Sequence, residues 1–329
     1  MGKLANKAVL LISPRTFSYE VEIKKQLEYM GAQVTYFDDR PFTSKFKKIL
    51  LRIAPLLTKI EVNSYFYNII KLTESKSFDY ILCIKQECFP HGLMKKLLAS
   101  QSQAKAVFYT WDSFANNPNA LKNVDLFDMV STFDSVDAEK YGLVHRPLFY
   151  LNEFSEMKVE VPSFDLSFVG SVHYKRYEFL KKIQQSLNGT RKIFFYQYVP
   201  SLLLFYGRKF LLFPWYGLSQ KSEFSFTTLD KHEIGDVFSK SKVIIDYAHH
   251  NQAGLTMRCI EALGANKKLI TNNKNIEKYD FYDSSNILIL SGNTIHIPND
   301  FFDTPYKPLD SSVYNRYSIA GWLEEVLGF

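Results

Sequence analysis

The sequence predicts an α/β protein with two doubly wound domains, each built on a parallel sheet covered by helices. Its 329 residues are enough for two cores of about 150 residues each. Strand and helix signals alternate twice along the chain, as they do in successive βαβ units. A polar, acidic segment at 150–163 interrupts this alternation. We therefore expect a first domain at 1–155, a second domain at 156–312 and a C-terminal helix at 313–329.

The first half begins with a strand at 7–13 and a helix at 17–30, whose apolar positions recur every three or four residues up to Gly31. Asp134 is expected to cap the short helix at 136–141. The other expected strands of this half are 33–37, 80–84, 106–109 and 129–133, with helical material at about 44–75 and 92–98.

In the second half, a short apolar β-branched run at 243–245 is typical of a buried parallel strand. A glycine-containing loop follows, and a helix is expected from about Leu255 to a C′ residue at Gly264. The other expected strands are 166–169, 193–196, 268–271 and 287–290, and the tail at 313–327 is expected to be one helix.

The start of this predicted helix is suited to a diphosphate. Its first N–H groups have no partner within the helix and carry the positive end of the helix dipole, so a phosphate can bind at Gly254, Leu255 and Thr256. Arg258 and Glu261 follow three residues apart and are expected to face the same crevice. The arginine suits a phosphate, and the glutamate suits a sugar diol.

Four segments, at 108–117, 133–150, 166–176 and 252–272, follow one another in an order that resembles GT-B glycosyltransferases. More closely, they are similar to small bacterial transferases of lipopolysaccharide, O-antigen and capsule assembly, and to the CgeB-type spore-coat family. The resemblance implies two Rossmann-like domains that face a central cleft, and a C-terminal helix at 313–329 that crosses back to the first domain. It implies that the domain at 1–155 binds the acceptor and that the domain at 156–312 binds the nucleotide sugar. It also implies that Glu261 holds the ribose of a nucleotide sugar, with Thr271 and Asn272 as weaker contacts.

The turn after the strand at 166–169 is a second candidate for donor contact. Gly170 and Ser171 end this strand and precede Tyr174 and Arg176, which brings a backbone turn and a cation to the ligand-binding edge of the sheet. The alternative is a plain strand-to-helix turn with a solvated first helical turn. His250 and Gln252 lie in the loop before the helix that is expected from about Leu255. They are candidates for contact with the donor's sugar or diphosphate.

Asp112 is the first candidate for a general base, because an aromatic residue beside a carboxylate is a common sugar-recognition pair and Trp111 precedes it. The alternative is that Asp112 caps the next segment and Trp111 packs between the domains. Glu20, Glu87 and His91 stand near other strand-to-helix turns and are rival bases.

No metal is expected. The adjacent histidines His249 and His250 have no third ligand at a suitable spacing, and the chain has no Asp-x-Asp triplet of the kind that metal-dependent GT-A transferases use. We expect no cofactor, and a UDP-, GDP- or dTDP-sugar as substrate. Ala253 and Leu269 stand where many retaining GT-B enzymes have a second glutamate, which favours inversion.

The sequence favours a cytoplasmic protein, because its N-terminus lacks a signal-peptide pattern and its three cysteines have no pairing pattern. The segment 44–59 has five basic residues, no acidic one and an apolar stripe, so it either contacts the inner membrane or packs as an ordinary helix. The segment 202–218 suits a lipid-linked acceptor or a core helix. No nucleic-acid partner is expected, because the basic residues of the chain do not interleave with aromatic residues along a recognisable RNA or DNA motif.

These observations predict a metal-independent glycosyltransferase that acts on a hydroxyl of a lipopolysaccharide core, O-antigen or capsule acceptor. The alternative from another class is a two-lobed sugar- or nucleotide-binding protein without catalysis. An epimerase or dehydrogenase with a dinucleotide turn is disfavoured, because the turn after the first strand, at 13–17, contains no glycine.

Overall fold

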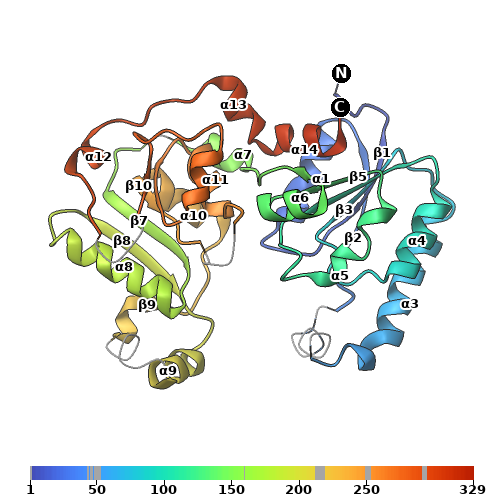
Figure 1. Ribbon diagram of the computed structural model, residues 1–329, viewed down its shortest axis with the longest axis horizontal. Helices are drawn as coiled ribbons and strands as arrows, with labels where there is room; N and C mark the ends of the chain where they lie inside the picture. Colours follow the sequence, from blue (N-terminus) through green and yellow to red (C-terminus); the bar gives the residue numbers. More distant parts are fainter. Residues whose placement is uncertain are drawn as a thin grey trace. The chain divides into compact units, whose positions relative to one another are not determined.

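The computed structural model describes residues 2–42, 44, 47, 53–158, 160–211, 219–248, 253–290 and 295–329. The chain forms two compact units (Figure 1). The first contains residues 1–148 and 319–329, and the second contains residues 149–318. Each unit has its own parallel sheet flanked by helices.

The sheet of the first unit has six parallel strands within the described residues, in the order β2-β1-β3-β4-β5-β6. Val9 in the central strand β1 pairs with Val34 on one side and Tyr80 on the other. The strands are β1 (Ala8–Ile12), β2 (Gln33–Phe37), β3 (Tyr80–Ile84), β4 (Lys105–Thr110), β5 (Met129–Thr132) and β6 (Val144–His145). Because all of them are parallel, the loops that follow their carboxyl ends gather along one edge of the sheet.

Helices cover this sheet because strands buried on both faces carry apolar side chains throughout. Leu10, Cys83 and Phe108 lie in one core cluster with Phe66 of the helix α3. The helices of the first unit are α1 (Tyr19–Tyr29), α3 (Pro55–Thr73), α4 (His91–Ser100), α5 (Pro118–Leu121), α6 (Ser135–Tyr141) and α14 (Ile319–Leu327), and a 3-10 turn, η1, covers Val124–Leu126.

The second unit repeats the plan, with six described parallel strands in the order β12-β11-β10-β7-β8-β9. Its strands are β7 (Phe164–Ser171), β8 (Ile193–Tyr198), β9 (Phe224–Ser225), β10 (Ser241–Ile245), β11 (Lys268–Thr271) and β12 (Ile287–Ile289). Its helices are α7 (Asn152–Ser155), α8 (Tyr174–Ser186), α9 (Leu202–Leu211), α10 (Lys231–Ser239), α11 (Met257–Gly264), α12 (Asn299–Asp303) and α13 (Ser311–Arg316), with 3-10 turns η2 (Lys221–Glu223) and η3 (Lys274–Lys278).

The predicted fold class, two doubly wound α/β units, is confirmed by these sheets. The predicted cap of α6 is also confirmed, because the Asp134 carboxylate accepts hydrogen bonds from the N–H groups of Val136 and Asp137. The two-residue edge strands β6 and β9 were not predicted, since a pair of residues carries no periodic signal.

The single helix predicted at 313–327 is wrong: the segment forms two helices, α13 and α14. Between them, the Tyr317 carbonyl accepts a hydrogen bond from the Tyr150 N–H at 2.8 Å, so it is unavailable to continue the helical ladder. The second helix, α14, packs in the first unit, where the buried Trp322 ring meets Tyr109 edge to face at 4.8 Å.

In the N-terminal basic segment 44–59, residues 45, 46 and 48–52 lie outside the described residues, and α3 begins at Pro55. The segment 202–218 is a helix, α9, up to Leu211, and its remainder is also outside the described residues. Among described helices, none combines the length and apolar character needed to cross a bilayer. The three cysteines are free thiols.

Candidate functional site

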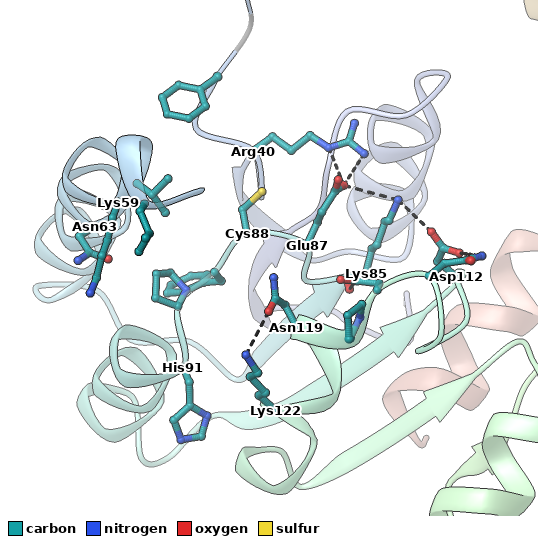
Figure 2. A pocket seen from close by; sticks show the side chains of 18 residues that line it. Arg40, Lys59, Asn63, Lys85, Glu87, Cys88, His91, Asp112, Asn119 and Lys122 are labelled. Carbon is teal, nitrogen blue, oxygen red and sulfur yellow. Dashed lines mark hydrogen bonds and ion pairs between the residues drawn. The ribbon is translucent and has the colours of Figure 1, made fainter. Parts of the chain in front are cut away.

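The first unit holds a pocket of about 820 Å³ beside the carboxyl ends of β2, β3 and β4 (Figure 2). Residues that follow these three strands line it together with residues of α3, α4 and α5. A cavity of this size is in the range of small-molecule binding sites. Its charged lining residues are Arg40, Lys59, Lys85, Glu87, Asp112 and Lys122.

The turn after β3 positions the charged side chains of Lys85 and Glu87, and its backbone is strained. Lys85 and Gln86 both have positive φ angles, 68° and 51°, and the Gln86 N–H donates to the Ile84 carbonyl at 2.9 Å. A three-residue turn of this kind is rare and strained for residues with side chains. Asn117 holds it by donating to the Lys85 carbonyl at 2.7 Å, and Asn123 donates to the Gln86 side chain at 2.8 Å. Strain maintained by such surroundings is characteristic of functional sites.

The charges in this pocket form a chain of ion pairs (Figure 2). Arg40 donates twice to one oxygen of Glu87, at 2.6 and 2.8 Å. The Lys85 ammonium lies 3.5 Å from Glu87 and 3.2 Å from the Asp112 carboxylate. Asp112 also accepts a hydrogen bond from the Asn116 amide at 3.1 Å. The carboxylate proposed as a base thus sits beside a cation.

Asp39 lies behind this chain and is fully buried. Its carboxylate accepts hydrogen bonds from the backbone N–H groups of Glu87, at 2.5 Å, and Cys88, at 3.3 Å. Burial raises the pKa of Asp39 to about 8, against the effect of these two hydrogen bonds. Asp39 therefore anchors the loop that carries Lys85 and Glu87.

The sequence-predicted bases fall in different places. Asp112 and His91 both line the pocket, as does the rival Glu87. In Figure 2 the His91 ring points away from Asp112, and its Nδ1 is 3.0 Å from the Asn123 side-chain oxygen. Glu20 does not line this pocket; it is buried in α1, where its carboxylate accepts the Thr16 N–H at 3.1 Å.

The second unit brings Gly170, Ser171 and Arg176 together at the carboxyl end of β7. The helix α8 begins without a side-chain N-cap hydrogen bond, and Arg176 lies in its first turn. The Arg176 guanidinium donates to the carbonyls of Ser171 and, at 2.6 Å, of Tyr247 after β10. Its Nε is buried and has no hydrogen-bond partner among the described residues. Burial lowers the pKa of Arg176, nearby Arg258 lowers it further, and Asp246 opposes both.

Asp246 organises the neighbouring strand end. This buried carboxylate accepts the Thr256 hydroxyl at 2.7 Å, and the Cys259 thiol and Thr271 hydroxyl both lie at 3.3 Å. Thr256 in turn is the N-cap of α11 and accepts the Cys259 N–H. The predicted start of this helix at Leu255 is thus two residues early, because the Thr256 cap sets the first turn.

Arg258 and Glu261 pair with one another, three residues apart on α11, at 2.8 Å. Both are largely buried, with 17% and 8% of their side-chain surfaces exposed, and Arg258 also lies over the Phe238 ring of α10 at 5.1 Å. The sequence predicted that this pair would face a ligand. In the structure each side chain already has a partner, so a ligand would have to share or replace that ion pair.

The remaining donor candidates have fewer described contacts. Gly254 and Leu255 are buried, and the Gly254 carbonyl accepts the Asn273 side-chain amide at 3.4 Å. His250, Gln252 and the side chain of Tyr174 lie outside the described residues. In the described part of the chain, no three His, Cys, Asp or Glu side chains are arranged to hold a metal ion.

Sequence reasoning missed Arg40, Lys85, Asp39 and Asp246 as site residues. A common signal marks them: each is charged and follows a predicted strand by one to three residues. In a parallel sheet, such positions meet at one edge.

Comparison of the whole chain with solved structures identifies proteins of similar fold. HepE from Anabaena in complex with UDP-glucose shares 9% sequence identity, covers 98% of each chain and has a TM-score of 0.61. The same protein in complex with UDP and glucose gives 11% identity, 98% coverage of each chain and a TM-score of 0.59. The UDP-GlcNAc 2-epimerase of Methanocaldococcus jannaschii shares 13% sequence identity with this chain and has a TM-score of 0.51. The alignment covers 87% of this chain and 89% of the epimerase chain.

No protein-family model matches the sequence, and no curated protein matches it either. At these low identities the structural likenesses concern the fold alone. Together with the two six-stranded parallel sheets, they show that the chain has the GT-B fold, with two Rossmann-like units.

Proposed function

We propose that this protein is a glycosyltransferase that takes a sugar from a nucleotide-diphosphate donor bound by the second unit. The observation that carries the proposal is the arrangement at the carboxyl end of β7. There the Gly170–Ser171 turn, the start of α8 without a side-chain cap and the Arg176 guanidinium converge, and the buried Arg176 Nε has no partner in the part of the chain that the structure describes. Helix N–H groups and a guanidinium are groups that bind phosphate.

A uridine nucleotide is the first donor to test, because the similar HepE structures contain UDP or UDP-glucose. GDP and dTDP sugars are the other candidates. Arg176 would offset the charge of the departing diphosphate, with the start of α11 at Gly254, Leu255 and Thr256 as a second phosphate contact. Glu261 would accept the ribose hydroxyls, which requires its ion pair with Arg258 to loosen on binding. No metal has a part in this proposal.

The pocket of the first unit would take the acceptor, and Asp112 would act as the base. The carboxylate of Asp112 would remove the proton from an acceptor hydroxyl, whose oxygen would attack the anomeric carbon. The bond from that carbon to the nucleotide diphosphate would break, and the diphosphate would leave with the bonding electrons. This single displacement inverts the anomeric configuration. His91 and Glu87, which line the same pocket, are the rival bases, whereas Glu20 lies outside it.

The resemblance in the sequence supports a cell-surface glycan as acceptor, of the lipopolysaccharide core, O-antigen or capsule type. Binding of the protein to a membrane surface would bring it to such an acceptor. Four apolar residues recur at helical spacing along α3 and just before it, and between 74% and 85% of the surface of each is exposed: Ile53, Leu56, Leu57 and Ile60. The segment 44–59 has five basic residues and no acidic one, so an anionic lipid surface complements its charge. Flotation with vesicles containing anionic lipid tests this contact, which L56E/I60E should abolish.

The test of the donor site is thermal unfolding of the full chain with UDP, GDP, dTDP, CMP and ADP, with and without EDTA. A nucleotide at about 100 times its Kd stabilises by about 2.7 kcal/mol. We expect R176A to remove this stabilisation, while K192A, which changes an exposed cation at the other end of the sheet, should keep it. Stabilisation that survives in R176A would contradict this donor site.

The test of the reaction is product analysis with the nucleotide sugar that binds. Release of the nucleotide with transfer of the sugar, or slow donor hydrolysis, supports a transferase, and D112N should lower that rate. Binding without turnover supports a sugar-binding protein. An epimerised nucleotide sugar would support an epimerase, since an epimerase of UDP-GlcNAc is among the similar structures.

A further inference from the structure

The pocket of the first unit has an excess of positive charge. Four cations line it, each contributed by a different segment: Arg40 after β2, Lys59 on α3, Lys85 after β3 and Lys122 after α5. Among the described residues, the lining contains two carboxylates, Glu87 and Asp112. The excess is therefore two positive charges, in a cavity of about 820 Å³.

The four cations are not equivalent. Arg40 and Lys85 are held in the ion-pair chain with Glu87 and Asp112, so their charge is balanced within the protein. Lys59 and Lys122 contact no carboxylate among the described residues. Among the described residues, the Lys122 ammonium donates one hydrogen bond, at 3.3 Å, to the Asn119 side-chain oxygen. The excess charge of the pocket thus belongs to Lys59 and Lys122.

Figure 2 shows these two lysines on different walls of the pocket, Lys59 beside Asn63 on α3 and Lys122 beside Asn119. The Lys122 ammonium contacts the Asn119 amide, and Asn63 lies one helical turn from Lys59 on α3. Amides donate and accept hydrogen bonds and suit sugar hydroxyls, whereas an ammonium group only donates and suits an oxyanion. The part of the pocket lined by Lys59, Asn63, Asn119 and Lys122 therefore has groups for both an oxyanion and sugar hydroxyls.

Exposed lysines alone are more often a solvated surface than a binding site. Here a second observation indicates a ligand: the strained turn at Lys85 and Gln86, which Asp39, Asn117 and Asn123 hold in place on the same pocket. This turn fixes the inner wall, where Lys85 meets Asp112. A wall of this rigidity is suited to orienting a ligand rather than to solvation.

We propose that the acceptor of this enzyme is an anionic glycan, whose phosphate or carboxylate group binds between Lys59 and Lys122 while a sugar hydroxyl faces Asp112. This inference rests on the proposed function, because it names the substrate class of the acceptor pocket. Phosphate and carboxylate share the chemistry that the two lysines recognise, and the test separates them.

The test is calorimetric titration of the full chain, without nucleotide, with three probes that differ in charge: glucose 6-phosphate, glucuronate and glucose. We expect at least one of the anionic sugars to bind about tenfold or more tightly than glucose, and increasing salt to weaken that binding. Binding of glucose 6-phosphate alone identifies a phosphate, and binding of glucuronate alone identifies a carboxylate.

The variants K59A and K122A should each weaken the anionic sugar about tenfold, while K96A provides the matched control. Lys96 is an exposed lysine on α4, a helix that also borders the pocket, but it does not line the cavity. Mass-spectrometric mapping of lysine acetylation gives an independent measure, because the anionic sugar should protect Lys59 and Lys122 and leave Lys96 unprotected.

Equal binding of the three probes, no binding of either anion, or equal weakening by K96A would overturn the inference. The donor site is measured on the same protein samples by the stabilisation that UDP or another nucleotide gives. Failure of the anionic probes with nucleotide binding intact therefore refutes the acceptor class alone. Failure of the nucleotides refutes the proposed donor site, whatever the sugars do.

Discussion

Replacing Gly264 with alanine tests how α11 is packed in the second unit. Gly264 is the last residue of that helix, and a Cβ built there would lie 2.4 Å from Cγ, 2.7 Å from Cβ and 2.8 Å from Cδ2 of Tyr150. Such distances are far inside van der Waals contact. Local preference alone would favour alanine over glycine in a helix by about 1 kcal/mol. The packing therefore predicts that G264A lowers the free energy of unfolding, whereas the local helix preference predicts that it raises it.

Tyr150 has little freedom to move away from an added methyl group. It is buried, its N–H donates to the Tyr317 carbonyl at 2.8 Å, and its hydroxyl donates to the Tyr314 carbonyl at 3.0 Å. The Tyr314 hydroxyl donates to the carbonyl of Gly264 itself at 2.6 Å. Overpacking of a fixed core costs about 1–3 kcal/mol or more. We expect G264A to destabilise the second unit by about 2–3 kcal/mol.

The measurement is urea unfolding followed by a probe of the second unit, since a chain of two units need not unfold in one step. Gly207 supplies the matched control: it lies inside α9, and a Cβ there would meet nothing within 4 Å. We expect G207A to stabilise by about 0.5–1 kcal/mol. In a Y150A background the cost of G264A should largely disappear, because the clashing ring is gone. A G264A protein as stable as the unchanged chain would refute the packing argument.

Three further predictions concern other parts of the two units. Asp39 has a folded-state pKa of about 8, above the ordinary value of about 3.9, so stability should fall as pH rises from about 4 to about 8, and D39N should flatten that dependence in unfolding curves at pH 5 and 8. T256A removes the cap of α11 and should cost about 1 kcal/mol in urea unfolding, whereas T256S, which keeps the hydroxyl, should cost less than half as much. L323A empties a fully buried position of α14 and should destabilise the first unit by about 2–4 kcal/mol, while V144A, at an exposed edge position, should cost under about 1 kcal/mol; equal losses would contradict the packing of α14.

The sequence by itself determined the sheets and their order of elements. Strands such as β2 and β3 were predicted with the bounds that the structure gives, because consecutive residues rich in apolar, aromatic and β-branched side chains favour a strand. The Asp134 cap was also predicted, since its carboxylate binds N–H groups only two and three residues away. Both signals are local, and a local signal survives without knowledge of the fold.

The tertiary structure alone decided which side chains share a site. The pocket combines residues from positions 40 to 122, and the ion-pair chain through Lys85 depends on a turn whose positive φ angles no helix or strand pattern announces. Likewise, Gly264 was predicted as a residue that ends the helix, whereas its lack of a side chain makes room for Tyr150, more than a hundred residues earlier. The break between α13 and α14 has the same origin, a hydrogen bond from Tyr150 to Tyr317. These features come from contacts between distant parts of the chain, and such contacts exist only once the strands are ordered and the loops at their ends meet.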